Sequence, residues 1–101
     1  MVGGDCDNSC ENLKNQLKYV KNHIDIRVGL EKKYKDELKL LKRDYNDCNN
    51  ETSFISRFTC KYNVLISIDA IESVRKINVR QYNEFVEEKK QIEKELKEND
   101  C

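Results

Sequence analysis

A chain of 101 residues is the size of one domain with a modest hydrophobic core. Its 19 basic and 19 acidic residues give a net charge of zero, without the basic excess that nucleic-acid binding needs. Three glycines and no proline exclude collagen-like and proline-rich classes. Since no apolar run is long enough to cross a bilayer, we expect no membrane-spanning helix.

The first predicted helix follows a flexible lead of residues 1–7, so the single helical domain is expected to cover 8–101. Asn8 and Glu11 have the spacing of a capping box. Apolar residues at spacings of three and four then mark one helix face: Cys10, Leu13, Leu17, Val20 and Ile24. Gly29, after a locally alternating segment, predicts a helix end and a tight turn.

A second stripe predicts a second helix that stops at the polar pair Asn49-Asn50. Its members are Leu30, Tyr34, Leu38, Leu41, Tyr45 and Cys48. The two stripes share one heptad frame across Gly29, so a single continuous helix is the alternative. We prefer the break, because one helix of that length exposes its stripe unless a partner covers it.

Residues 54–74 hold the densest apolar run of the chain. Apolar side chains on nearly every side of this third helix, capped by Thr52 or Ser53, predict a segment buried by its neighbours. A fourth helix is expected to begin at Ser67 or Asp69. The prediction is therefore an all-α, disulfide-stapled antiparallel bundle of about four helices. The alternative is a long two-helix antiparallel hairpin that turns at residues 48–51.

Five cysteines in a chain of this length indicate a disulfide framework and an oxidising compartment. A zinc site is not expected, because there is no Cys-x-x-Cys pair and His23 is the only histidine. In the four-helix topology all the cysteines but one gather at one end of the bundle. The favoured pairs are Cys48–Cys60 and Cys10–Cys101, with Cys6 as the alternative to Cys10 and one thiol left over.

Asn50-Glu51-Thr52 is an acceptor sequence for N-glycosylation at a predicted turn. Taken with the cysteines, it favours a secreted, extracellular protein. No apolar signal segment follows Met1, so the start of the chain is equally that of a cytosolic protein or of a secreted one after signal removal.

Catalytic motifs and phosphate-binding loops are missing from the sequence, so we expect no enzyme, no cofactor and no metal. The function class that these exclusions leave is a binding protein. We expect it to be a monomer or weak dimer that binds no nucleic acid and does not span a membrane. In the four-helix topology the stapled end is acidic and the opposite end basic, a field that steers charged partners. The candidate partner-binding residues are Lys32, Lys33, Arg75, Lys76, Arg80 and Tyr82.

Three features resemble one family of small helical secreted proteins. Cys6-x-x-x-Cys10 leads into an amphipathic helix, Cys48 and Cys60 flank a polar turn, and Cys101 closes the chain. This pattern is similar to the albicin-like salivary proteins of anopheline mosquitoes, which inhibit the alternative pathway of complement. The resemblance implies a salivary protein of immune evasion that docks on a host plasma protein, the complement convertase. The alternatives are an inhibitor of coagulation or kinin generation and a helical carrier of a small hydrophobic ligand.

Overall fold

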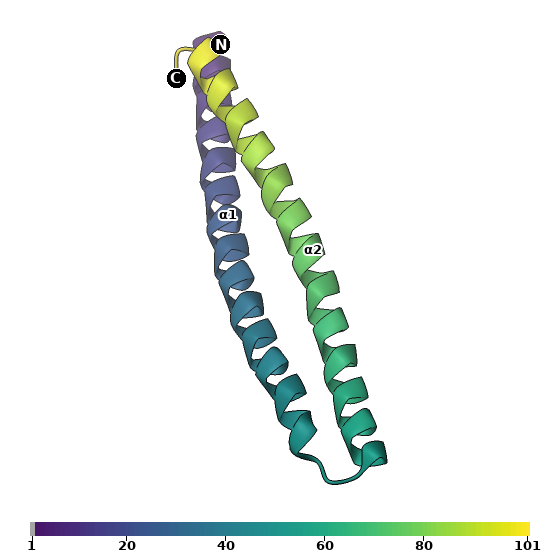
Figure 1. Cartoon of the computed structure of the whole chain (residues 1–101). Helices are drawn as coiled ribbons and strands as arrows, with labels where there is room; N and C mark the ends of the chain where they lie inside the picture. Colours follow the sequence, from purple (N-terminus) through teal and green to yellow (C-terminus); the bar gives the residue numbers. More distant parts are fainter. Residues whose placement is uncertain (1) are drawn as a thin grey trace. The chain divides into compact units, whose positions relative to one another are not determined.

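Two long helices make up almost the whole chain. The computed structural model describes the backbone of residues 2–101 and the side chains of residues 9–101. Helix α1 spans Val2–Asp47, the 3-10 helix η1 spans Cys48–Asn50, and α2 spans Phe54–Glu98 (Figure 1). No strand occurs among the described residues, which confirms the all-α prediction. The four-helix bundle is wrong, and the two-helix alternative has the right number of helices.

Helix α1 runs through Gly29 without a break, so the predicted turn there is wrong. The break was expected because a helix of this length would expose its apolar stripe unless a partner covered it, and the structure supplies that partner. A stretch of α2 lies against the apolar stripe of α1 on either side of Gly29, and the shared heptad frame then needs no interruption. Helix α1 also starts earlier than expected. The backbone of residues 2–7 is helical, Asn8 lies inside the helix, and the flexibility of this lead stays a prediction.

Gly29→Ala is expected to stabilise the protein. A Cβ atom at Gly29 would meet nothing within 4 Å, and the backbone there is already helical. Glycine in a helix interior costs about 0.5–1 kcal/mol relative to alanine, so the free energy of unfolding should rise by about that amount. Urea titration followed by circular dichroism measures the change. A loss of stability would show that the helix does not continue through this residue.

Helix α2 is likewise continuous, so the predicted start of a fourth helix at Ser67 or Asp69 is wrong. Hydroxyl groups in this region bond to the helix backbone instead of capping a new one. Ser67 Oγ donates to the carbonyl of Asn63 at 3.3 Å, four residues earlier. The predicted cap at the true start is confirmed, because Ser53 Oγ accepts a bond of 3.0 Å from the Ser56 N–H.

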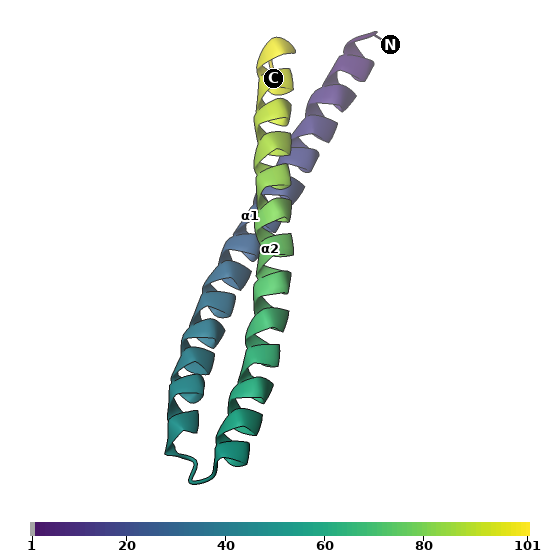
Figure 2. The same cartoon turned by 45° about the vertical axis from the view of Figure 1, so that its right-hand side comes forward.

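The chain divides into two compact units. Unit 1 consists of the chain up to Val28 together with Arg80–Cys101, and unit 2 is Gly29–Val79. Each unit pairs a stretch of α1 with a stretch of α2, and Figure 2 shows the short connection that joins the helices in unit 2. For the described side chains, burial in each unit therefore takes place along one helix–helix seam.

Unit 1 has a small apolar core. Leu13, Val20 and Ile92 are buried, and the partly buried residues packed around them are Leu17, Ile24, Phe85 and Leu96. An aromatic cluster extends this core: the ring of His23 stacks on Phe85 at 5.1 Å and lies 4.3 Å from Tyr19. The seam of unit 1 is thus held mainly by apolar and ring contacts.

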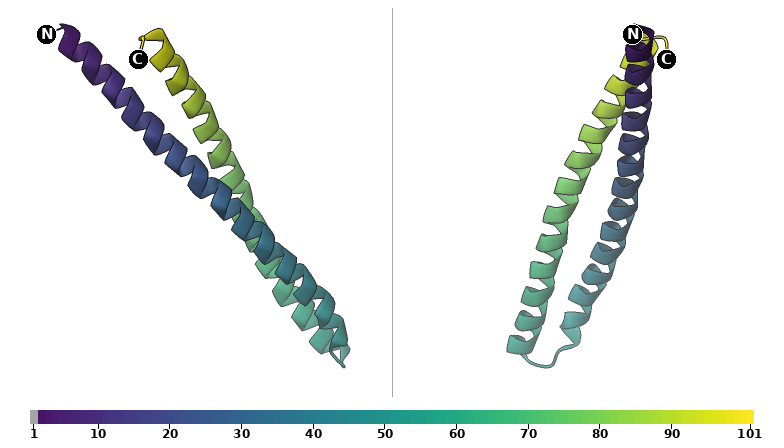
Figure 3. Two further views of the ribbon diagram at one scale, coloured as in Figure 1. Left: turned by 90° about the vertical axis from the view of Figure 1, so that its left-hand side faces the viewer. Right: turned by 180° about the vertical axis from the view of Figure 1, so that it is seen from behind.

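A disulfide between Cys10 and Cys101 closes unit 1, with the two Cα atoms 5.7 Å apart. The chain reaches this position through a Schellman motif at the end of α2. Asp100 has a positive φ of 53°, its N–H bonds to Lys97, and the Cys101 N–H bonds to Leu96 at 2.9 Å. The last residue therefore leaves the helix, as both views of Figure 3 show. The side chain of Cys6, the alternative partner of Cys101, lies outside the described residues.

Unit 2 is held by a second disulfide and a polar layer. Cys48, which is fully buried, bonds to Cys60 across the turn, with a Cα–Cα distance of 5.6 Å. Arg75 Nε donates to Glu31 Oε1 at 2.7 Å, and Asn78 is only 3 % exposed. A buried polar residue in an apolar seam favours one register, because shifting the helices would leave it without partners.

Two further expectations are wrong because they depended on the four-helix topology. The cysteines do not gather at one end, since Cys10–Cys101 belongs to unit 1 and Cys48–Cys60 to unit 2. The run 54–74 is not buried by its neighbours either. Among the described residues α1 alone packs against this run, so α2 half-buries one face, including Val64, Ile68 and Ile71, and exposes most of the rest.

Candidate interaction surface

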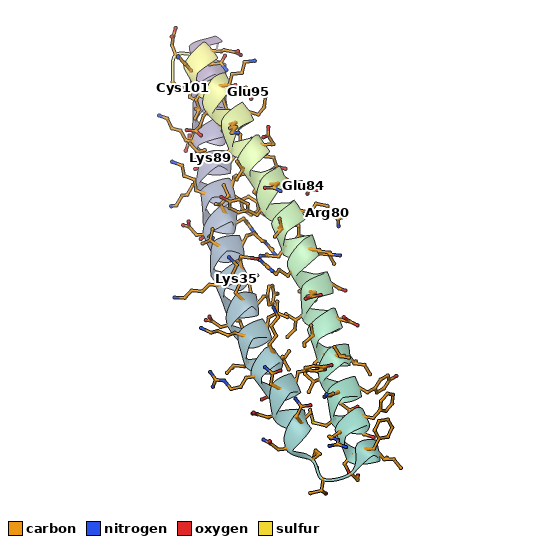
Figure 4. The ribbon with its side chains drawn as sticks, viewed as in Figure 1. Lys35, Arg80, Glu84, Lys89, Glu95 and Cys101 are labelled. Atoms are coloured by element: carbon orange, nitrogen blue, oxygen red, sulfur yellow. A yellow bond between two sulfur atoms is a disulfide. The ribbon has the colours of Figure 1, made fainter. Side chains whose placement is uncertain are left out.

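Four lysines lie along one side of α1 in unit 2, and we call them the basic flank: Lys32, Lys35, Lys39 and Lys42. Their spacings of three, four and three residues place them on one helix face. All four are exposed, and Lys35 is labelled in Figure 4. Leu38 is buried in the helix–helix seam, whereas the four lysines are exposed. The flank therefore lies beside the helix–helix contact and not within it.

None of these lysines has a carboxylate within 4.0 Å among the described side chains. Lysines on α2 of unit 1 behave differently. Lys89, Lys90 and Lys94 each form an ion pair with a glutamate three or four residues away. The flank of α1 therefore keeps a local positive charge in a protein with no net charge.

Neighbouring lysines of the flank reinforce one another. Residues three or four apart on a helix have Cβ atoms about 5–6 Å apart, which is less than the Debye length of about 8 Å at physiological salt. From Lys32 to Lys42 the helix rises by roughly 15 Å, at 1.5 Å per residue. The flank is thus a straight basic strip suited to an elongated acidic surface.

Unit 1 carries its own lysines on α1. Lys14, Lys18 and Lys21 are exposed and line a shallow hollow together with the exposed Tyr19. Asp25 lies at its edge and offsets part of the charge. This hollow sets the tyrosine ring among lysines; of these two residue types, tyrosine is enriched at protein interfaces and lysine is depleted.

The structure separates the candidates that the sequence analysis grouped. Lys32 belongs to the basic flank, whereas Lys33 is exposed but turned about 100° further around the helix. Arg75 is held by Glu31, which makes it a seam residue with a side chain 38 % exposed. Lys76 is exposed on α2 beside a shallow hollow that Glu72 and Val79 also line.

The remaining two candidates lie in unit 1. Arg80 is exposed and labelled in Figure 4, and Tyr82 is half-buried. The structure therefore does not gather the six candidates into one described site. The predicted acidic and basic ends fail with the four-helix topology on which they depended.

The sequence analysis did not single out Lys35, Lys39 and Lys42. The signal that identifies them is a heptad repeat. Lys14, Lys21, Lys35 and Lys42 differ by multiples of seven, and so do Lys18, Lys32 and Lys39. Seven-residue repeats of one charge return to nearly the same helix face once that helix is continuous.

Other kinds of site find little support among the described residues. They contain no group of three or more His, Cys, Asp and Glu side chains placed to hold a metal ion. No described helix combines the length and apolarity that crossing a bilayer requires. Asn50 is exposed in η1, and its glycosylation stays a prediction.

These features define a class: an all-α, disulfide-bonded protein of two long paired helices. Comparison with known proteins does not narrow that class, because no family model, curated protein or solved structure matches the chain.

Proposed function

We propose that this chain is a secreted, non-enzymatic binding protein that inhibits a host defence cascade, with the alternative pathway of complement as its target. The observation that carries the binding role is the basic flank, four exposed lysines without acidic partners on a disulfide-closed helix pair. The complement target comes from the resemblance to albicin-like proteins. In this proposal the protein docks on the convertase and keeps that enzyme in an unproductive state.

Rigidity supports an inhibitory role. A disulfide across the turn and the Glu31–Arg75 pair hold α1 against α2 in unit 2, so the flank is preformed before a partner arrives. A surface that is already ordered loses less conformational entropy on binding than a mobile segment does. The basic flank then recognises an acidic surface of the partner through long-range attraction.

Such lysines act mainly on the association rate. Exposed rim charges accelerate encounter and are screened by salt, whereas dissociation depends on the close contacts of the interface. The wild-type association rate should therefore fall as salt concentration rises. A protein whose lysines only solvate the helix would show neither effect.

The test compares two variants that each remove three positive charges. Lys35→Gln/Lys39→Gln/Lys42→Gln neutralises most of the flank, and Lys89→Gln/Lys90→Gln/Lys94→Gln is the matched control on paired lysines. Binding to alternative-pathway convertase assembled from plasma components is followed by surface plasmon resonance. We expect the flank variant to associate about five- to tenfold more slowly with little change in dissociation, and the control to stay within about twofold.

Two results would contradict the proposal. Equal association rates for both variants would remove the flank from the interface. Absence of wild-type binding to the convertase, with no loss of alternative-pathway activity in plasma, would refute the complement target. Retention of a coagulation or kinin-pathway protein from plasma by the oxidised wild type would then identify the alternative cascade.

A further inference from the structure

One side of α1 in unit 2 holds positive charge and almost nothing else. At 100° per residue, the four lysines of the basic flank span about 80° of the helix, Asn46 falls among them and Arg43 lies at the edge. Between residues 32 and 46 this sector contains no carboxylate and no apolar side chain. Arg43 is exposed and, like the lysines, has no carboxylate within 4.0 Å among the described side chains.

The glutamate best placed to neutralise the flank is turned into the seam. Glu31 lies four residues before Lys35, the order in which glutamate and lysine pair best on a helix. Glu31 Oε1 instead accepts the bond of 2.7 Å from Arg75 Nε, and Glu31 Oε2 is buried. Asp36 lies just outside the sector. The flank with Arg43 is therefore a row of exposed cations that has an acidic neighbour at one edge only.

The composition of this row indicates a ligand that is held by charge alone. Protein interfaces are anchored by aromatic and other large side chains, and lysine is depleted in them. Single-stranded nucleic acid stacks its bases on aromatic rings along a basic groove. The sector offers neither a ring nor an apolar side chain. It can steer an acidic protein surface without anchoring it, whereas a sulfated sugar chain has no apolar part and needs no anchor.

The spacing of the cations is also suited to a linear chain. Consecutive members of the row follow one another at rises of about 1.5–6 Å, and the distance along the axis from Lys32 to Arg43 is roughly 16 Å. Sulfated glycosaminoglycans are unbranched and stiff, with sulfate and carboxylate groups repeated along their length. A chain laid along α1 would meet all five cations without either molecule bending.

We propose that the basic flank, extended by Arg43, binds a linear sulfated polysaccharide of the glycosaminoglycan class. Each contact releases a counterion from the polyanion, so binding weakens as salt rises. With five contacts, and the dependence measured for single-stranded polyanions, the logarithm of the binding constant should fall with the logarithm of salt concentration at a slope of about −3.5.

This inference shares the flank with the proposed function but does not depend on the complement target. A polysaccharide chain and an acidic protein surface cannot occupy the same lysines together. A saturating sulfated oligosaccharide should therefore slow association of the protein with the convertase, if the flank steers that encounter.

Isothermal titration calorimetry with a heparin decasaccharide tests the proposal. At physiological salt we expect a dissociation constant of about 1–100 µM, the range in which proteins bind DNA without sequence specificity. Lys35→Gln/Lys39→Gln/Lys42→Gln should weaken binding at least about tenfold and reduce the magnitude of the salt slope by about 2. The matched control Lys89→Gln/Lys90→Gln/Lys94→Gln removes the same charge from paired lysines and should stay within about twofold.

Further arms separate the flank from a structural effect and sulfated sugar from other polyanions. Lys35→Arg/Lys39→Arg/Lys42→Arg keeps the charge and should bind at least as tightly as the wild type. A desulfated decasaccharide should not bind measurably, and single-stranded DNA of equal charge should bind more weakly because the sector has no ring on which bases stack.

Four results would overturn the proposal: a wild type that does not bind the decasaccharide, equal losses in the flank and control variants, retention of the desulfated chain, and DNA or anionic vesicles bound as tightly as heparin. None of these measurements involves the convertase. Convertase binding without heparin binding would therefore refute this inference alone, and heparin binding without convertase binding would refute only the complement target.

Discussion

Replacing Cys10 and Cys101 by serine is expected to lower the free energy of unfolding by about 4.5 kcal/mol, on the chain-entropy model of disulfides. The bond joins residues 91 positions apart, so its loss releases nearly the whole unfolded chain from a covalent loop. Native proteins of this size are stable by only about 5–15 kcal/mol, so the loss is a large share of the total. The unfolding of unit 1 should become much less cooperative. Few apolar contacts remain to compensate, because the buried core of unit 1 consists of Leu13, Val20 and Ile92 among the side chains that the structure describes.

The measurement is urea denaturation of the double variant and of the parent, both with Cys6→Ser. That background matters because Cys6 lies one helical turn before Cys10 and would otherwise offer Cys101 a substitute thiol. A loss below about 1 kcal/mol would mean that the 10–101 bond does not restrict the unfolded chain in solution.

Replacing Cys48 and Cys60 by serine is expected to lower the free energy of unfolding by about 3 kcal/mol, less than for the first pair because these cysteines are only 12 positions apart. The serine at position 48 also places a hydroxyl group at a buried position, since Cys48 is 1 % exposed. Helix α2 begins at Phe54, between these cysteines, so its first turns should fray in this variant.

Hydrogen exchange resolves the two effects. Amides of 54–60 should exchange faster in the Cys48→Ser/Cys60→Ser variant, while those around Val20 and Ile92 keep their protection. Uniform acceleration through both units, or a loss larger than that of the 10–101 pair, would contradict the dependence on loop length.

Much of the local structure was readable from residues alone. The stripes from Leu13 in α1 to Cys48 in η1 predicted which residues face a partner, and Leu13, Val20, Leu38 and Cys48 are buried. Ser53 was a predicted cap and accepts the expected bond. Side-chain period and capping depend on neighbours within a few residues, which is why a single sequence reports them.

The number of helices was not readable in that way. Gly29 and the Ser67–Asp69 segment are weak helix positions, and local propensity assigned a break to each. Packing against a long partner helix outweighs such costs, because each interrupted position would remove contacts along the seam. The same misassignment grouped the cysteines at one end and placed Arg75 on a free basic surface.

The candidate surface was predictable only in part. Lys32 was proposed from charge, but the flank needed a continuous α1 to bring Lys35, Lys39 and Lys42 into line with it. Composition determined a helical chain able to form disulfides. Only the tertiary structure decided which apolar face is buried, because residues 54–66 are apolar on both sides of α2 while α1 can cover one. A helix with one neighbour buries one face and leaves the other exposed, and no local pattern records which of the two apolar faces that neighbour will cover.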